Sequence, residues 1–226
     1  MTWPHIASPT EVLSEDAAGF VLAGGRSSRM GTDKALVRLG GQTLVAHAIG
    51  TLRQAGLAVS IAGGQEALAA FAPLVEDPQS GLGPLSGICA ALESSRARLA
   101  VFLPVDMPML PASLVQALLQ HAAVAHSAVT LASLNGFALT FPAVLDRLVL
   151  HTLRDELTSG RGGCIAAFRA AAAKLGEPVA ILPVEMLVQT GQVTDPAGQP
   201  PVRWFLNVNT EEDLRRAEVF RQAFIA

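Results

Sequence analysis

Cysteine is scarce in this chain of 226 residues, which contains only Cys89 and Cys164. The two are far apart in the sequence, and neither has a Cys or His nearby at the spacing of metal ligands. The sequence therefore indicates neither a disulfide framework nor a zinc site. We expect both residues to be core thiols of a protein in a reducing compartment.

Charge is sparse as well, because charged residues make up 15% of the chain and the formal net charge at pH 7 is -3. Without a general basic surface, duplex nucleic acid is not an expected partner. Residues 1–16 lack the basic start and the apolar run of a signal peptide. No segment has the roughly 18 uninterrupted apolar residues of a membrane span. We therefore expect a cytoplasmic protein that binds neither nucleic acid nor membrane.

Hydrophobic residues make up 50% of the chain, which is enough for one substantial core. Short apolar runs alternate with longer segments of helical period, as in βαβ units around a parallel sheet. The sequence predicts a three-layer α/β fold, with a mostly parallel sheet and helices on both faces. We expect residues 1–17 to be a loose N-terminal extension and residues 18–226 to form a single domain.

The periodicity also predicts where the elements lie. The helix predicted at 42–56 places Leu44, Ala48 and Leu52 on one face and ends at Gly56, a favoured residue for a helix end. Thr210 and Asp213 have the spacing of a capping box at the start of a last helix. The other predicted helices are 84–95, 112–125, 143–157 and 162–176. The predicted strands are 19–23, 58–62, 99–104, 127–132, 137–141 and 179–184.

A glycine turn with several charges follows the first predicted strand, in the segment GFVLAGGRSSRMGTDKAL at residues 19–36. Arg26, Arg29, Asp33 and Lys34 lie close to this turn, although the whole chain has only two lysines. Its spacing is neither that of the dinucleotide fingerprint nor that of the ATPase phosphate loop. In open α/β sheets, ligands bind beyond the carboxyl ends of the strands. A phosphate-bearing ligand therefore explains the turn better than a solvated connection does.

Asp106 follows an apolar strand directly, in FLPVDMPML, so its carboxylate is expected at the same edge of the sheet. An Asp in this position can also shape a turn before Pro108. If a triphosphate lies across this edge, Mg²⁺ requires a carboxylate in addition to the phosphates, and Asp106 is the best candidate. Asp33 is the next candidate.

Two further segments place polar groups at this edge. Asp77 precedes a glycine-rich loop, EDPQSGLGPLSG, and could accept hydrogen bonds from the N–H groups of a purine. Asn207 and Asn209 alternate around Val208 as in a strand, so both could point to one side. The ordinary alternatives are a loop before a helix and a pair of turn asparagines.

Together these segments resemble the signatures of molybdenum cofactor guanylyltransferases, enzymes that join GMP to molybdopterin. The resemblance lies in LAGGRSSRMGTDKAL, DPQSGLGPLSG, VDMP and NVNTEEDL, and extends from about Gly19 to Leu214. It implies a Rossmann-like nucleotidyltransferase fold, GTP and molybdopterin as substrates, and Mg²⁺ as cofactor. It also implies enzymes that deliver and accept the cofactor as partners.

The resemblance also assigns roles to residues. It implies catalytic roles for Arg29, Lys34 and Asp106, with Asp106 as the metal ligand. LAGG favours GTP, because relatives that use CTP more often have Ala in place of the first Gly. The nucleotide-binding residues that it implies are Leu22, Ala23, Gly24, Gly25, Lys34, Asp77 and Asp106. The residues assigned to the acceptor side are Gly83, Gly87, Asn207 and Asn209.

Two departures from the family pattern leave alternatives open. Ala62, Gly63 and Gly64 stand where relatives often have an Asn, and residues 133–142 lack the usual His-Pro pair. One alternative is a transferase of the same fold that uses CTP or another phosphorylated acceptor. The other is a protein that binds nucleotide or cofactor without catalysis. No strong general base is required for catalysis, because the attacking phosphate is already an anion.

Overall fold

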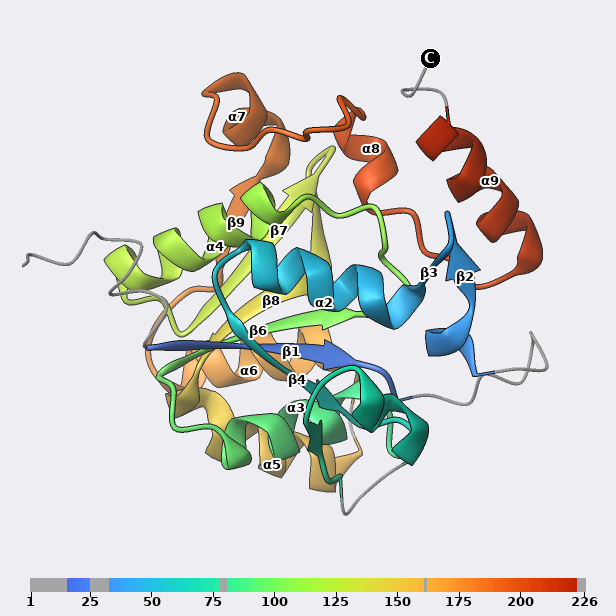
Figure 1. Cartoon of the computed structure of the whole chain (residues 1–226). Coiled ribbons are helices and arrows are strands. Elements are labelled where there is room, and N and C mark those ends of the chain that lie inside the picture. The colour runs from blue at the N-terminus through green and yellow to red at the C-terminus, as the bar shows by residue number, and fades with distance from the viewer. Residues whose placement is uncertain (1–15, 25–32, 78–80, 161, 223–226) are drawn as a thin grey trace, which may run out of the picture.

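The computed structural model describes residues 16–24, 33–77, 81–160 and 162–222. Its centre is a seven-stranded sheet in the order β5-β4-β1-β6-β8-β7-β9 (Figure 1). Strand β8 is antiparallel to both β6 and β7, whereas the other neighbouring strands are parallel. The strands are β1 (Ala17–Leu22), β4 (Ala58–Ala62), β5 (Leu74–Val75), β6 (Leu99–Pro104), β7 (Val129–Leu134), β8 (Phe137–Asp146) and β9 (Ala180–Pro183).

Helices cover both faces of this sheet, which confirms the predicted three-layer, mostly parallel α/β fold. One face packs against α2 (Leu44–Gln54), α4 (Ala112–Ala125), α7 (Val184–Gln189) and α8 (Pro201–Trp204). The other face packs against α3 (Pro84–Ser94), α5 (Leu150–Ser159) and α6 (Cys164–Lys174). The short 3-10 helices are η1 (Lys34–Leu36), η2 (Glu66–Ala70) and η3 (Arg147–Val149).

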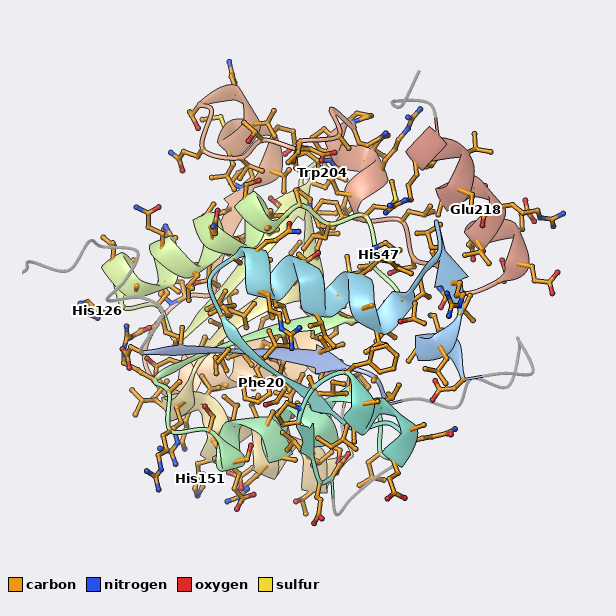
Figure 2. The ribbon with its side chains drawn as sticks, in the orientation of Figure 1. Phe20, His47, His126, His151, Trp204 and Glu218 are labelled. Carbon is orange, nitrogen blue, oxygen red and sulfur yellow. The ribbon has the colours of Figure 1, made fainter. Side chains whose placement is uncertain are left out.

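The alternation of side chains along β6 builds a core on each side of the sheet. Leu99, Val101 and Leu103 belong to the core beneath α2 and α4, whereas Ala100 and Phe102 belong to the core beneath α3 and α6. Figure 2 shows Phe20 and Trp204 on opposite sides of the sheet, and each belongs to one of these cores. Because the strand is buried on both faces, its sequence LAVFLP is continuously apolar.

Most predicted elements are present, but some boundaries differ. Strand β1 begins at Ala17 rather than Gly19, and β7 covers Val129–Leu134 rather than 127–132. The helix predicted at 143–157 is wrong in its first part, because β8 continues through Asp146 and α5 begins at Leu150. Ala143, Val144 and Leu145 pair with both β6 and β7, so tertiary pairing prevails over their helical periodicity.

The two cysteines are free and buried, as predicted, in the core beneath α3 and α6. Burial raises the pKa of each thiol to about 11. Both therefore remain protonated at neutral pH and are not activated nucleophiles. Within the described residues, no helix has the length and apolar character that crossing a membrane would require.

A small second unit lies beside the main sheet, where α9 (Glu211–Gln222) packs on the hairpin of β2 (Arg38–Leu39) and β3 (Gln42–Thr43). Leu39, Leu44, Val208 and Ala217 form its buried core. The predicted capping box of α9 is confirmed by hydrogen bonds in both directions between Thr210 and Asp213. The packing of α9 on the hairpin attaches this last helix to the segment that follows Lys34.

Candidate active site

The carboxyl ends of β1 and β6 form the switch point of the sheet. From β1, the chain continues on one side to β4, whereas β6 is the neighbour on the other side. Leu22 pairs with Pro104 at the end of this strand pair, and the N–H of Val105 donates to the Leu22 carbonyl at 3.2 Å. The segments after the two strands therefore begin side by side, where α/β sheets bind their ligands.

Lys34 lies at this edge, where it contacts the residue that follows β6 and Val105. It begins η1, and the Asp33 carboxylate caps that short helix by accepting the Ala35 N–H at 3.0 Å. The ammonium of Lys34 donates to Asp106 Oδ2 at 2.9 Å and to Asn209 Oδ1 at 2.5 Å. The side chains of Lys34 and Asp106 are partly buried, with 16% and 24% of their surfaces exposed. The structure thus brings together three predicted site residues from distant parts of the chain.

The segment before α9 reaches this edge through a backbone contact. The N–H of Val208 donates to the Asp106 carbonyl at 2.9 Å, while its side chain is buried against the hairpin unit. Asn207 and Asn209 are both exposed on either side of it. The alternation indicated by the sequence is present in the burial of these three residues, although residues 205–209 belong to no helix or strand. The chain still runs beside Asp106, but through one backbone hydrogen bond rather than a ladder.

Asp77 lies after the carboxyl end of β5, near the start of α3. The hydroxyl of Ser86, in the first turn of α3, donates to Asp77 Oδ1 at 2.5 Å. Gly83 precedes that helix with a φ of 88°, a conformation that favours glycine. Gly87 lies on the buried face of α3, where an added Cβ would stand 3.7 Å from the Ala62 side chain. Sequence reasoning missed Ser86, although it belongs to the same glycine-rich segment as Asp77.

The turn after β4 packs against the turn after β1. Gly63 has a φ of 74°, and a Cβ on it would lie 3.2 Å from the Cα of Gly24. A Cβ on Gly64 would come within 2.7 Å of the Leu68 side chain. The glycines at 63 and 64 thus allow the backbones of two strand ends to approach closely. The GG pair in IAGGQE is the sequence signal for this contact.

The structure describes only part of the turn after β1, where several site residues are predicted. The N–H of Ala23 donates to the Ala62 carbonyl at 3.2 Å, which extends the pairing of β1 with β4 beyond Leu22. Gly24 ends the described segment and contacts Gly63. Gly25, Arg26 and Arg29 lie outside the described residues.

The hairpin of β7 and β8 forms the wall on the β6 side of this edge. Phe102 pairs with Ala143 in antiparallel register, so the first residues of β8 extend past the carboxyl end of β6. Leu139 and Phe141 on this part of the strand pack against the cores of the sheet. Residues 137–142, FALTFP, contain no acidic, basic or histidine side chain. This wall therefore offers apolar contact and no general base.

The donor set fits Mg²⁺ bound jointly by protein and substrate. Among the described residues there is no cluster of three or more Asp, Glu, His or Cys side chains that could hold a metal alone. Mg²⁺ commonly takes one or two carboxylates and completes its shell with phosphate oxygens and water. Asp106 at the strand end provides such a carboxylate, whereas Asp33 is used as the cap of η1.

The structure is an α/β domain with a lysine and a carboxylate paired at the switch point of its sheet, where α/β sheets bind their ligands. Residues 19–189 match the family model described as the MobA-like NTP transferase domain. The chain therefore belongs to the MobA-like NTP transferase family, a family of nucleotidyltransferases.

Several curated relatives carry the name molybdenum cofactor guanylyltransferase, among them the following two. The protein from Sinorhizobium fredii is 36% identical over 214 residues, which cover 88% of each chain. The protein from Xanthomonas euvesicatoria is 44% identical over 118 residues, which span 50% of this chain and 60% of that relative.

Solved structures share the fold at lower identity. Molybdopterin-guanine dinucleotide biosynthesis protein A from Archaeoglobus fulgidus has a TM-score of 0.72 and 21% identity, with 91% of this chain and 99% of that chain covered. Rv0371c from Mycobacterium tuberculosis, solved in complex with manganese, has a TM-score of 0.60 and 20% identity, with 90% and 98% covered. At these identities the likeness establishes the architecture alone.

Proposed function

We propose that the protein transfers GMP from GTP to the phosphate of molybdopterin and releases pyrophosphate. The observation that carries the proposal is the position of Lys34, between Asp106 and Asn209 at the switch point of the sheet. Family membership and the name shared by several curated relatives support the same reaction. LAGG at residues 22–25 and the carboxylate of Asp77 support GTP as the donor.

In this reaction, an oxygen of the molybdopterin phosphate forms a bond to the α-phosphorus of GTP. The bond from the α-phosphorus to the oxygen that bridges the α- and β-phosphates breaks, and its electron pair leaves with pyrophosphate. The nucleophile is an anion and the leaving group is good, so positioning and charge neutralisation provide most of the catalysis. Such a reaction does not depend on a general base, and residues 137–142 beside the site carry no acidic, basic or histidine side chain.

Each site residue then has a separate task. Lys34 donates hydrogen bonds to the phosphates and neutralises part of their charge. Asp106 would hold Mg²⁺, which supplies further neutralisation of the phosphate oxygens when it is bound. Asp77, oriented by Ser86, accepts hydrogen bonds from the N–H groups of guanine.

The test is pyrophosphate release by the purified protein with molybdopterin, Mg²⁺ and either GTP, CTP or ATP. We expect turnover with GTP and much slower turnover with the other nucleotides. Faster turnover with CTP than with GTP would refute the assignment of guanine as the base. Turnover only with a different phosphorylated acceptor would refute molybdopterin as the acceptor. Tight GTP binding without pyrophosphate release would indicate a binding protein instead of an enzyme.

A further inference from the structure

The cap of α9 is connected to the site lysine through Asn209. One oxygen of Asp213, Oδ2, accepts the N–H of Asn209 at 3.0 Å, the N–H of Thr210 at 3.0 Å and the Thr210 hydroxyl at 2.9 Å. An ordinary capping box requires only the reciprocal bonds with the capping residue. The additional bond holds the backbone of Asn209, whose side chain contacts Lys34.

The backbone of Asn209 depends on this bond because its segment has little other support. Residues 205–209 belong to no helix or strand, and Asn209 itself is exposed. On one side, Val208 is fixed by its bond to the Asp106 carbonyl and by its buried side chain. On the other side, Asp213 fixes the N–H of Asn209. The backbone of Asn209 is therefore held from two sides, by the fixed position of Val208 and by the carboxylate of Asp213 in α9.

We propose that Asp213 is a positioning residue of the active site: its carboxylate holds Asn209 in the orientation that places the ammonium of Lys34. The catalytic contacts remain those of Lys34 and Asp106, and Asp213 acts through Asn209. The part of this inference that concerns turnover rests on the proposed guanylyl transfer. Helix α9 thereby has a role in catalysis beyond packing on the hairpin unit.

The charge of Asp213 supports this role. Hydrogen bonds from the Asn209 amide, and then from Thr210, hold the pKa of Asp213 below its ordinary value. The carboxylate is therefore ionised at neutral pH, and charged acceptors form the stronger hydrogen bonds. Glu212 is an exposed acid in the same turn of α9 and, within the described residues, makes no hydrogen bond to Asn209. It provides a matched control.

The experiment is a double-mutant cycle with Asp213→Ala and Asn209→Ala, measured by pyrophosphate release and by GTP affinity in the presence of Mg²⁺. We expect Asp213→Ala to lower turnover about tenfold in the wild-type background and less than about twofold in the Asn209→Ala background. Asp213→Glu, which restores the acid of a capping box, should recover most of the activity, and Glu212→Ala should retain it. The melting temperature should fall with Asp213→Ala in both backgrounds, because the helix cap is lost in each.

A purely structural cap gives a different pattern. Asp213→Ala would then lower the melting temperature while its turnover and GTP affinity matched those of Glu212→Ala. A loss of activity that is equally large with and without Asn209 would also overturn the proposal. If the wild-type protein releases no pyrophosphate, the proposed reaction fails, and the same cycle is evaluated in GTP affinity alone. Coupling in affinity would still support Asp213 as a positioning residue, whereas additive losses would refute it.

Discussion

Replacement of Lys34 by alanine is the most direct test of the candidate site. The variant removes the ammonium that donates to Asp106 and Asn209. A hydrogen bond to a charged group contributes about 1.5–3 kcal/mol. Since about 1.4 kcal/mol corresponds to a factor of ten, one lost bond to a phosphate predicts a roughly 10- to 150-fold loss of GTP affinity or turnover.

The effect of Lys34→Ala on stability should be smaller than its effect on function. The ion pair is partly buried, with exposed side-chain fractions of 16% for Lys34 and 24% for Asp106. Its contribution should lie between those of exposed and fully buried pairs, at about 1–2 kcal/mol. In a chain of this size, that loss lowers the melting temperature by roughly 2–8 °C.

Calorimetry with GTP and Mg²⁺, pyrophosphate release and thermal denaturation measure the three effects separately. Lys174→Ala is the matched control, because Lys174 is the only other lysine and is exposed near the end of α6. The assignment of Lys34 is refuted if both variants retain the same GTP affinity and the same turnover as the wild-type protein.

Three other substitutions address separate groups. Asp106→Asn should lower Mg²⁺-dependent pyrophosphate release about 100-fold while GTP affinity falls much less, and full activity would exclude Asp106 as the metal ligand. Ser86→Ala removes a hydrogen bond to Asp77, so competition binding should show the preference for GTP over CTP reduced by about tenfold; an unchanged preference would contradict the role of Ser86. Burial lowers the pKa of His47 below 6.5, so its neutral form stabilises the fold above about pH 6.5 and this contribution declines as the pH falls below that value. The melting temperature of His47→Gln should therefore fall less between about pH 7.5 and pH 5.5 than that of the wild-type protein. An equal fall in the two proteins would show that His47 is not the cause of this pH dependence.

The sequence predicted the strand ends of the site because local chemistry marks them. LAVFLP followed by Asp106 shows both a buried strand and a carboxylate at its end, and LAGG marks the turn after β1. Parallel pairing of β1 and β6 then places the two segments at one edge. The order of the motifs along the chain and the α/β periodicity were sufficient for this part of the site.

The contacts of Asn209 and Ser86 were beyond that reasoning. Asn209 is 175 residues from Lys34, and the alternation around Val208 indicates that Asn207 and Asn209 share a side but not which residue they face. Its position depends on the packing of Val208 in the hairpin unit and on the cap of α9. Ser86 was missed because a hydroxyl in the first turn of a helix is ordinary until the fold places Asp77 beside it. Residues 143–146 were also predicted wrongly, because their helical period is local and their pairing with two neighbouring strands depends on the fold.

The proposed reaction gives a physical reason for the ion pair between Lys34 and Asp106. A lysine side chain loses up to about 2 kcal/mol of rotamer entropy when it is ordered, and here much of that cost is met during folding. On the proposed function, Asp106 would hold the metal and Lys34 would bind a phosphate when the substrate is bound. Each of the two charges would then have an opposite charge as its partner, with or without the substrate. Asn209 can hold the ammonium in both states, because its neutral amide binds the lysine without competing for the metal as strongly as a carboxylate would.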